Sequence, residues 1–334
     1  MRIGTYRTPE SGDWRAALFV TPDTVLDLAD AARSLGQPVP LAADWRPDAD
    51  VVNWITPQGL ELARSILATS EESRLDKHMR ALASVQHGPP MPRPGKFIAV
   101  GRNYMNHVRE GQKIWAARGK TVALPTFPAS FVKFASGIVA HGMPLVIPQG
   151  VENVDYEVEL AFVISRPAYR VPVERALGYV AGYTVCNDVG ARAIQRLEME
   201  SQIGITLAKN FRSFAPMGPW FVTADEIPDP QQLEVSLHVN GEQRQHCGTE
   251  DMIFPIAQLV SYWSQVGLEP GDVITTGTPA GVALAMPEPE RYYLKPGDVV
   301  KASVTRIGDL VNTVRAESIE ELHKISCLKH LQAP

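Results

Sequence analysis

Four prolines fall within eight residues in the segment Gly88-Pro-Pro-Met-Pro-Arg-Pro-Gly95. Proline fixes its own backbone angle and has no N–H to donate, so this segment can neither continue a helix nor pair well in a sheet. We therefore expect it to divide the 334-residue chain into two domains, residues 1–87 and residues 95–330. A chain of this length has room for one large domain and one smaller one.

The residues before this boundary predict a small α/β domain. Two short apolar stretches, Arg15–Thr21 and Thr24–Leu28, are predicted strands, and Pro22-Asp23 between them is typical of a turn. Residues Gln58–Ser84 are predicted to be helical, because leucine, isoleucine and methionine recur there at helical spacing.

The residues after the boundary are rich in strand-like runs and poor in helices. The predicted helices are Ala191–Glu200 and Ile256–Val266. The predicted strands are Phe97–Gly101, Phe131–Phe134, Pro144–Ile147, Glu157–Ile164, Tyr179–Cys186, Glu234–Asn240, Asp272–Thr276 and Val299–Val304. Because the strands do not alternate regularly with helices, the pattern excludes a doubly wound sheet and predicts an α+β domain around a β-rich core.

Composition excludes several classes of protein. The net charge is −5 and no long basic run occurs, which argues against nucleic acid or an anionic membrane as a partner. No apolar stretch reaches the roughly 18 residues that a membrane span needs, and we see no secretory signal. Cys186, Cys247 and Cys327 form no CxxC pair, which argues against a disulfide framework or a zinc site. We therefore expect a protein of the reducing cytoplasm.

The strongest local feature is the run Asp155-Tyr-Glu-Val-Glu-Leu-Ala-Phe-Val-Ile164. On a strand, side chains alternate between the two faces, so Glu157 and Glu159 lie on one face and apolar residues fill the other. Two neighbouring carboxylates that leave water repel each other, so one is expected to take up a proton unless a cation binds. Oxygen-only ligands suit Mg²⁺, Mn²⁺ or Ca²⁺. The alternative is that this face is exposed to solvent at a strand end.

A third carboxylate follows the predicted strand Tyr179–Cys186. Asp188 stands at the end of that strand and just before the predicted helix, a position where sites on β-containing folds are often built. It could complete an oxygen-only metal site with Glu157 and Glu159. The alternative is that Asp188 is the N-cap of the helix.

His107 and Glu110 stand three residues apart, within Gly101–Glu110. In a helical turn they lie on one face and can form a hydrogen bond, which fixes the imidazole tautomer and prepares it as a general base. The alternative is an ordinary surface pair. The polar stretch Gly111–Leu124 behind them is either a mobile lid over the site or a plain surface loop.

Two further features could bind an anion. The turn Ile274-Thr-Thr-Gly-Thr-Pro-Ala-Gly281 offers backbone amides and threonine hydroxyls to a carboxylate, and it lacks the ending of a phosphate-binding P-loop. Lys133 and Lys209 lie among apolar or small residues, where a lysine is costly to bury unless it meets an anion. The alternative is that each lysine extends its ammonium to the surface.

Taken together, these segments resemble the fumarylacetoacetate hydrolase superfamily. The segments that carry the resemblance are Val100-Gly-Arg-Asn-Tyr104 with His107 and Glu110, Asp155–Glu159, Asn187–Gln195, Ala208-Lys-Asn-Phe211 with Ala215–Pro219, and Thr276–Val282. They occur in the order found in the family, over about residues 95–315. They look most like the members that hydrolyse acylpyruvates or decarboxylate oxaloacetate.

The resemblance implies a β-rich α+β catalytic domain, of mixed β-sandwich or roll type, and a homodimer. It implies that the metal ligands are Glu157, Glu159 and Asp188, holding Mg²⁺, with Mn²⁺ or Ca²⁺ as alternatives. The catalytic residues that it implies are His107, Glu110 and Lys209. The residues that it implies for binding the substrate are Arg102, Lys133, Arg192, Gln195 and Thr278.

The reaction implied is hydrolysis of a carbon–carbon bond in a diketo acid, such as an acylpyruvate or a substrate like fumarylacetoacetate. His107 would deprotonate the attacking water, and the metal and Lys209 would stabilise the departing pyruvate-type enolate. Decarboxylation of oxaloacetate, or tautomerisation or hydration of a 2-oxo acid, uses the same enolate and stays an alternative. A protein that only binds a metal or a carboxylate has no need of the His107–Glu110 pair.

Two departures from the family pattern bear on these expectations. The stretch between Glu110 and Lys133 is longer than in the compact acylpyruvase members, which leaves the lid and the size of the pocket open. Gly190 stands where many members have serine or threonine, so a hydroxyl near the site is missing.

Overall fold

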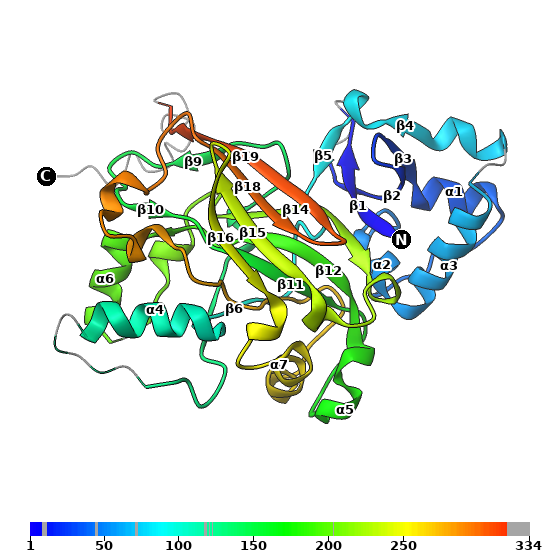
Figure 1. Ribbon diagram of the computed structural model, residues 1–334. Coiled ribbons are helices and arrows are strands. Elements are labelled where there is room, and N and C mark those ends of the chain that lie inside the picture. Colours follow the sequence, from blue (N-terminus) through cyan, green and yellow to red (C-terminus); the bar gives the residue numbers. More distant parts are fainter. Residues whose placement is uncertain are drawn as a thin grey trace, which may run out of the picture.

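The computed structural model describes residues 1–318 except 9–11, 44–45, 71–72, 117–118, 120, 122 and 203. The predicted α+β class is confirmed: strands dominate and the helices are few and short (Figure 1). The helices are α1 Leu28–Ser34, α2 Val51–Ile55, α3 Pro57–Ala68, α4 Met105–Ala116, α5 Val173–Ala176, α6 Arg192–Glu200 and α7 Ile256–Trp263.

The largest sheet within the described residues has twelve strands, in the order β4-β3-β2-β1-β14-β12-β11-β17-β6-β7, with β5 paired to β1 and β8 to β14. Its strands are β1 Arg2–Arg7, β2 Arg15–Thr21, β3 Thr24–Asp27, β4 Met79–Ala81, β5 Gln86–Gly88, β6 Phe97–Val100, β7 Ser130–Val132, β8 Ile138–Val139, β11 Val158–Ile164, β12 Val180–Asn187, β14 Ala215–Thr223 and β17 Val273–Thr275.

A second, five-stranded sheet has the order β16-β15-β18-β19-β9. Its strands are β9 Leu145–Ile147, β15 Glu234–Val239, β16 Glu242–Gly248, β18 Val299–Val304 and β19 Gly308–Ala316, and β10 Val154–Asp155 pairs with β13 Gly190–Ala191. Apolar side chains of both sheets, such as Leu160 and Leu237, belong to one core cluster. The opposite face of the large sheet, including Val163, packs with Trp54 and other residues of α1–α3. The described chain is therefore layered, with β11 in the middle layer and buried on both faces.

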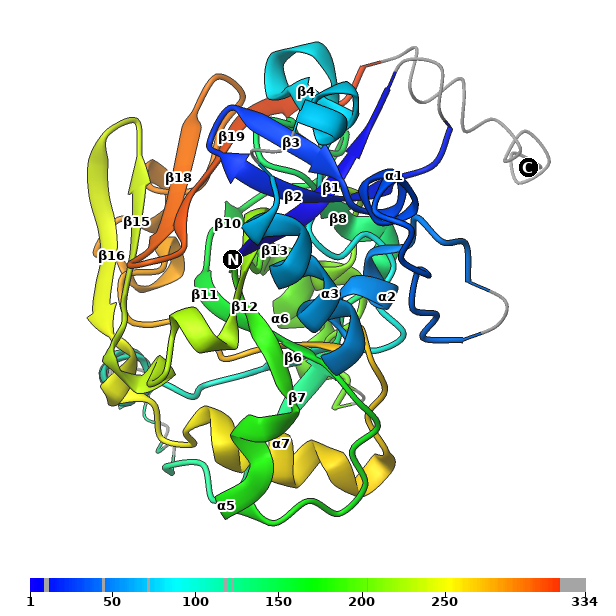
Figure 2. The ribbon, with the colours of Figure 1, turned by 90° about the vertical axis from the view of Figure 1, so that its right-hand side faces the viewer.

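The two sides of the proline-rich segment share the large sheet. Strand β1 pairs antiparallel with β14, with Ile3 opposite Phe221, so the N-terminal strands extend the sheet that carries β11. Figure 2 shows the N-terminal helices in front of these strands. The division into residues 1–87 and 95–330 therefore stays a prediction, and residues 319–330 lie outside the described residues.

Predicted and observed elements agree in kind in most places, and one prediction was wrong. Residues Gln58–Ser84 are not one helix, because α3 ends at Ala68 and Met79–Ala81 form strand β4, which pairs with β3. Pairing with an existing sheet edge has overridden the helical spacing of the apolar residues. The helix predicted at Ile256–Val266 is α7, followed by a 3₁₀ turn at Ser264–Val266.

The cysteines and the helices bear on two further expectations. Cys186 and Cys247 are free thiols, and Cys327 lies outside the described residues. Over the part of the chain that is described, no helix is both long enough and apolar enough to cross a membrane.

The buried His87 of β5 is expected to make the protein less stable in acid. It packs against Phe19 and His141, and burial, reinforced by His141, lowers the pKa of His87 from 6.5 to about 4. Its neutral form therefore stabilises the fold fully above pH 6.5, and this contribution is lost as the pH falls to about 4, at a cost of about 3 kcal/mol. We expect His87→Gln to flatten the dependence of urea unfolding on pH between 7 and 4. Replacement of the exposed His246 is the control, and an unchanged dependence in His87→Gln would contradict this assignment.

Candidate metal centre

The pair Glu157 and Glu159 lies at the start of β11, inside the protein. Their exposed fractions are 7% and 1%, so the alternative of a solvent-exposed strand face is wrong. The alternation predicted from the sequence holds: Val158 and Leu160 point into the core between the sheets, and Ala161 and Val163 point toward the N-terminal helices. The near-continuous apolar run is typical of a strand buried on both faces.

Asp188 is brought to these residues by the pairing of β11 with β12. In that register Glu159 lies opposite Cys186 and Val158 opposite Asn187, and the Asp188 N–H donates to the Glu157 carbonyl over 2.8 Å. The N-cap of α6 is Ala191, which makes no side-chain capping bond, so the N-cap alternative for Asp188 is wrong. One carboxylate oxygen from each of Glu157, Glu159 and Asp188 lies within 4.8 Å of the others. We call these three residues the acidic triad.

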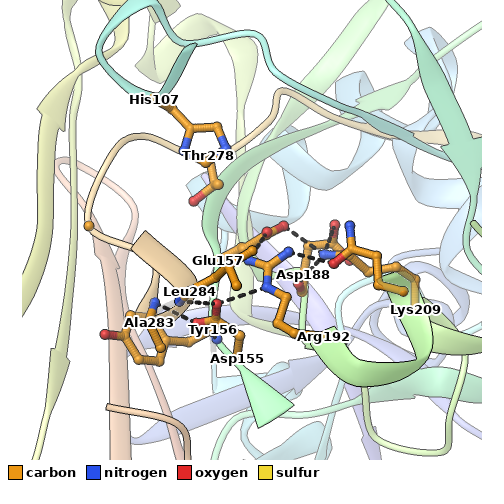
Figure 3. A network of polar contacts seen from close by, with 12 residues as sticks. His107, Asp155, Tyr156, Glu157, Asp188, Arg192, Lys209, Thr278, Ala283 and Leu284 are labelled. Carbon is orange, nitrogen blue, oxygen red and sulfur yellow. Dashed lines mark hydrogen bonds and ion pairs between the residues drawn. The ribbon is translucent and has the colours of Figure 1, made fainter. Parts of the chain in front are cut away.

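Lys209 bridges two members of the acidic triad. Its Nζ donates to Glu157 Oε2 over 2.6 Å and to Asp188 Oδ2 and the Asp188 carbonyl over 2.9 Å each (Figure 3). The residue is 2% exposed, so the alternative of a lysine that extends to the surface is wrong. Its ammonium is therefore placed where it touches the acidic triad directly.

Arg192 holds Glu157 from the other side. Its Nη2 donates to Glu157 Oε1 over 2.6 Å, its Nε to Asp155 Oδ2 over 2.8 Å, and its Nη1 to Gln195 Oε1 over 2.7 Å. These bonds are drawn in part in Figure 3. Arg192 and Gln195 were both expected to contact the substrate. In this arrangement Arg192 orients a member of the acidic triad, and Gln195 orients Arg192.

Lys133, which was expected to bind the substrate, is also buried, at 2% exposure. Its Nζ donates to Asp188 Oδ1 over 2.5 Å, to the Lys209 carbonyl over 2.8 Å and to the Phe214 carbonyl over 2.9 Å. An ammonium has three N–H bonds, and all three are used within the protein. In this arrangement Lys133 supports Asp188, and its role in binding the substrate stays a prediction.

Thr278 and Arg102 were expected to bind the substrate as well. The Thr278 hydroxyl donates to the Val158 carbonyl over 3.0 Å and accepts from Gln245 over 2.8 Å, so it braces the turn against β11. Arg102 is exposed and donates to the Ala123 carbonyl over 2.8 Å. Neither side chain contacts the acidic triad among the bonds of the described residues.

The predicted pair of His107 and Glu110 is confirmed as a contact on α4. His107 Nδ1 lies 3.1 Å from Glu110 Oε2, and Glu110 Oε1 accepts from the Gly281 N–H over 2.9 Å. Gly281 has a φ of 104°, and a Cβ there would lie 2.1 Å from the Arg244 carbonyl oxygen, so only glycine fits. His107 contributes to lowering the pKa of Glu157, and Figure 3 places it above Glu157 and Asp188. The expected lid, Gly111–Leu124, lies partly in α4 and partly outside the described residues.

Asp155 is a buried residue of the site to which the sequence assigned no role. Its carboxylate accepts from Arg192 and from the backbone N–H groups of Ala283 and Leu284, over 2.8 Å, 2.8 Å and 3.0 Å. It therefore joins the helix α6 to the segment after the Thr276–Val282 turn. The feature of the sequence that could have indicated Asp155 is its position just before the Glu157–Glu159 pair, next to a strand that is apolar on both faces.

The surroundings of the site shift the pKa values of Glu157 and Glu159 in opposite directions. Burial by itself raises the pKa of Glu157, but the Lys209 ammonium and the Arg192 guanidinium lower it to about 2. Glu159 has no lysine or arginine at ion-pair distance among the described residues, and burial beside Asp188 and Glu157 raises its pKa well above the usual range. Without a metal, Glu159 is therefore the carboxyl that holds a proton, as expected for one of two neighbouring buried acids.

This asymmetry predicts that metal binding releases a proton. Because a cation must displace the proton of Glu159, the affinity for Mn²⁺ should rise by about tenfold per pH unit below the pKa of Glu159. The same shift affects folding. Because the pKa of Glu159 is higher in the folded than in the unfolded protein, the metal-free fold should lose stability as the pH rises above 4.5, the pKa of Glu159 in the unfolded chain. Calorimetric titration in two buffers of different ionisation enthalpy measures the proton. Glu159→Gln should bind Mn²⁺ more weakly and release none. Proton-independent binding by the wild-type protein would exclude this assignment.

Gly190 gives room to Lys209. A Cβ at this position would lie 3.0 Å from Lys209 Cε and 3.2 Å from its Nζ. The Lys209 side chain therefore passes over Gly190 on its way to Glu157, through space that a side chain at this position would crowd.

Comparisons with known proteins found a matching family and similar proteins. The family described as fumarylacetoacetate (FAA) hydrolase, C-terminal, matches residues 96–315. The oxaloacetate tautomerase fahd2 of Xenopus laevis, a mitochondrial protein, is 38% identical over 258 residues, which are 76% of this chain and 76% of that protein.

Two solved structures are similar along nearly their whole length. Maleylpyruvate hydrolase from Sphingobium, in complex with manganese(II) and pyruvate, is 27% identical with a TM-score of 0.71, covering 95% of this chain and 100% of that chain. The 5-carboxymethyl-2-hydroxymuconate delta-isomerase from Mycobacterium smegmatis is 30% identical with a TM-score of 0.67, at the same coverage. The similar proteins thus include a hydrolase, an isomerase and a tautomerase.

Proposed function

Because the chain belongs to the fumarylacetoacetate hydrolase family, an enzyme family, we propose that it is a metal-dependent hydrolase that cleaves a carbon–carbon bond in a diketo acid. The observation that carries this proposal is the contact between His107 and Glu110, with His107 placed over Glu157 and Asp188 in Figure 3 and acting electrostatically on Glu157. A positioned general base is needed to activate water, whereas binding or tautomerisation of a 2-oxo acid does not require an attacking water.

The donor set fits a divalent cation. Glu157, Glu159 and Asp188 offer oxygens only, which Mg²⁺ and Mn²⁺ prefer, and Glu159 has no cationic side chain at ion-pair distance among the described residues. A bound ion would supply Lewis-acid polarisation of the substrate's oxo group. Mg²⁺ is our proposal for the metal. The structure of the similar maleylpyruvate hydrolase holds Mn²⁺ and pyruvate.

His107 is suited to take a proton from water. An ionised Glu110 can only accept, so His107 Nδ1 must carry the hydrogen of their 3.1 Å contact, which leaves Nε2 free as the base. We propose that the water activated in this way attacks the distal carbonyl carbon of the substrate. When the carbon–carbon bond breaks, its electron pair stays on the pyruvate fragment, which takes a proton. The products are pyruvate and a carboxylic acid.

Lys209 is suited to stabilise the charge that develops on the oxo oxygen. Burial lowers the pKa of its ammonium, but Asp188 and Glu157 raise it above the usual value, so the group stays charged. A fixed positive charge beside a developing enolate oxygen acts most strongly in a site that excludes water.

The test is a direct assay of the purified protein. With Mg²⁺ or Mn²⁺ and an acylpyruvate, the absorbance of the diketo acid should fall and pyruvate should form in equal amount. Both should stop when EDTA removes the metal. Metal binding without turnover of any diketo acid would refute the hydrolase proposal.

A second candidate function is tautomerisation of oxaloacetate. It is supported by the 38% identity to oxaloacetate tautomerase fahd2. The same assay with oxaloacetate distinguishes the two: enol–keto conversion without acylpyruvate cleavage would favour this candidate over hydrolysis, whereas release of CO₂ would indicate a decarboxylase instead. For the assembly we propose a homodimer, the usual state implied by the family resemblance, to be checked by light scattering.

A further inference from the structure

Lys209 is carried by a very short element. It ends the 3₁₀ turn Leu207–Lys209, between α6 and β14, yet its ammonium reaches Glu157 and Asp188 of the acidic triad. A single 3₁₀ turn has weak hydrogen-bond geometry and little stability of its own. Its position must therefore be set by side chains outside the turn.

Glu198 of α6 holds this turn from one side. Its carboxylate accepts from the backbone N–H groups of Thr206, Leu207 and Ala208, over 3.0 Å, 2.7 Å and 3.0 Å. Bonds from N–H groups to an ionised carboxylate are stronger than neutral ones. The three donors are the residues that lead directly into Lys209, so Glu198 fixes the backbone from which the lysine extends.

Asn210 holds the turn from the other side. Its amide nitrogen donates to the Val132 carbonyl over 3.0 Å and to the Thr206 carbonyl over 2.8 Å, and its oxygen accepts from the Phe134 N–H over 2.5 Å. The residue between Val132 and Phe134 is Lys133, which donates to the Lys209 carbonyl. The two buried lysines are thus tied to one turn.

We propose that Glu198, with Asn210 as a second tie, is a positioning residue that holds the Lys209 ammonium against Glu157 and Asp188. The inference rests on the proposed function in one respect, which is that the anion bound beside the metal is a 2-oxo acid. Glu198 is part of α6, which also carries Arg192 and Gln195, so one short helix would set both cations that flank Glu157.

The position of Lys209 has opposite effects on two ligands. Its ammonium competes with a divalent cation for Glu157 and Asp188, and it attracts an anion that binds beside that cation. Loosening Lys209 should therefore tighten Mn²⁺ binding and weaken the binding of oxalate, a dianion resembling the pyruvate enolate. General damage to the fold would weaken both.

The experiment measures both affinities by calorimetry in the full-length protein, for wild type, Glu198→Ala, Lys209→Met and the double variant. We expect Lys209→Met to weaken oxalate binding about 30–100-fold and Glu198→Ala about 5–10-fold, the range for charged hydrogen bonds lost or loosened. The affinity of the metal-free protein for Mn²⁺ should rise by about tenfold in Lys209→Met and by about threefold in Glu198→Ala. Glu198→Gln, which keeps one strong acceptor, should lie between wild type and Glu198→Ala.

Two comparisons make the result decisive. Glu200→Ala removes the same charge from the same helix without touching the turn, and it should match wild type. The double variant should match Lys209→Met, because Glu198 acts only through Lys209. Additive effects in the double variant, or weaker binding of both ligands by Glu198→Ala and Glu198→Gln, would overturn the proposal.

The failure of the proposed function has a separate signature. If wild type binds Mn²⁺ but not oxalate, the assignment of a 2-oxo acid site is lost. The positioning role is then decided by Mn²⁺ alone: Glu198→Ala must tighten binding in the presence of Lys209 and have no effect in Lys209→Met.

Discussion

Replacement of Asp188 by alanine is expected to abolish divalent-metal binding and to destabilise the fold. Asp188 supplies one of three oxygen ligands and also accepts from Lys133 and Lys209, each 2% exposed. Without it, two buried ammonium groups lose a counter-anion, and breaking a buried pair costs roughly 3–5 kcal/mol. Titration with Mn²⁺ and urea unfolding of the metal-free protein measure the two effects.

Glu159→Gln is the matched control for that prediction. It also removes a carboxylate of the acidic triad, but burial raises the pKa of this carboxyl well above the usual range, which favours its neutral form without a metal. We expect it to weaken Mn²⁺ binding strongly while leaving the stability of the metal-free protein close to wild type. If Asp188→Ala bound Mn²⁺ normally, the acidic triad would not be the metal site. If both variants lost equal stability, the inferred charge pattern would be wrong.

Replacement of His107 by alanine is expected to lower kcat by roughly 10²–10⁴-fold, the usual contribution of a positioned general base. Metal binding should be unchanged, because His107 is not among the three ligands. The measurement is steady-state hydrolysis of an acylpyruvate, combined with Mn²⁺ titration of the same preparation.

Two further variants sharpen the test of His107. Glu110→Gln keeps a hydrogen-bond acceptor for the Nδ1 hydrogen but removes the charge, so it should lower kcat less than His107→Ala. Replacement of the exposed His246 should leave kcat at the wild-type value. Full hydrolytic activity in His107→Ala would remove the observation on which the hydrolase proposal depends.

The acidic triad could be predicted in part because its signals are local. A period of two places Glu157 and Glu159 on one face of a strand, whatever the rest of the fold. Asp188 could be placed only at a strand end. What joins it to the pair is the register of β11 against β12, in which Val158 lies opposite Asn187, and this depends on tertiary packing.

The roles of the basic residues were harder to predict, because their partners are distant in the chain. Lys133 donates to carbonyls of Lys209 and Phe214, which are 76 and 81 residues away. Sequence context indicated that a buried lysine must meet an anion, and it could not indicate that the anion would be Asp188. Asp155 was missed for the same reason, since it accepts from the Ala283 N–H, 128 residues away. Glu198 was missed for a different reason: its partners are nearby backbone N–H groups, which no residue type in the sequence marks.

The charges gathered at the site have a consequence for the order in which ligands arrive. Four buried carboxylates (Asp155, Glu157, Glu159 and Asp188) face three buried cations (Lys133, Arg192 and Lys209), which leaves one unpaired acid that is neutral when protonated. A 2-oxo acid anion entering that site meets no surplus positive charge. Once a divalent ion replaces the proton, the surplus is a single positive charge, which one monoanion neutralises. Kinetics should therefore be ordered, with the metal bound before the substrate, and the anion should slow the metal's dissociation.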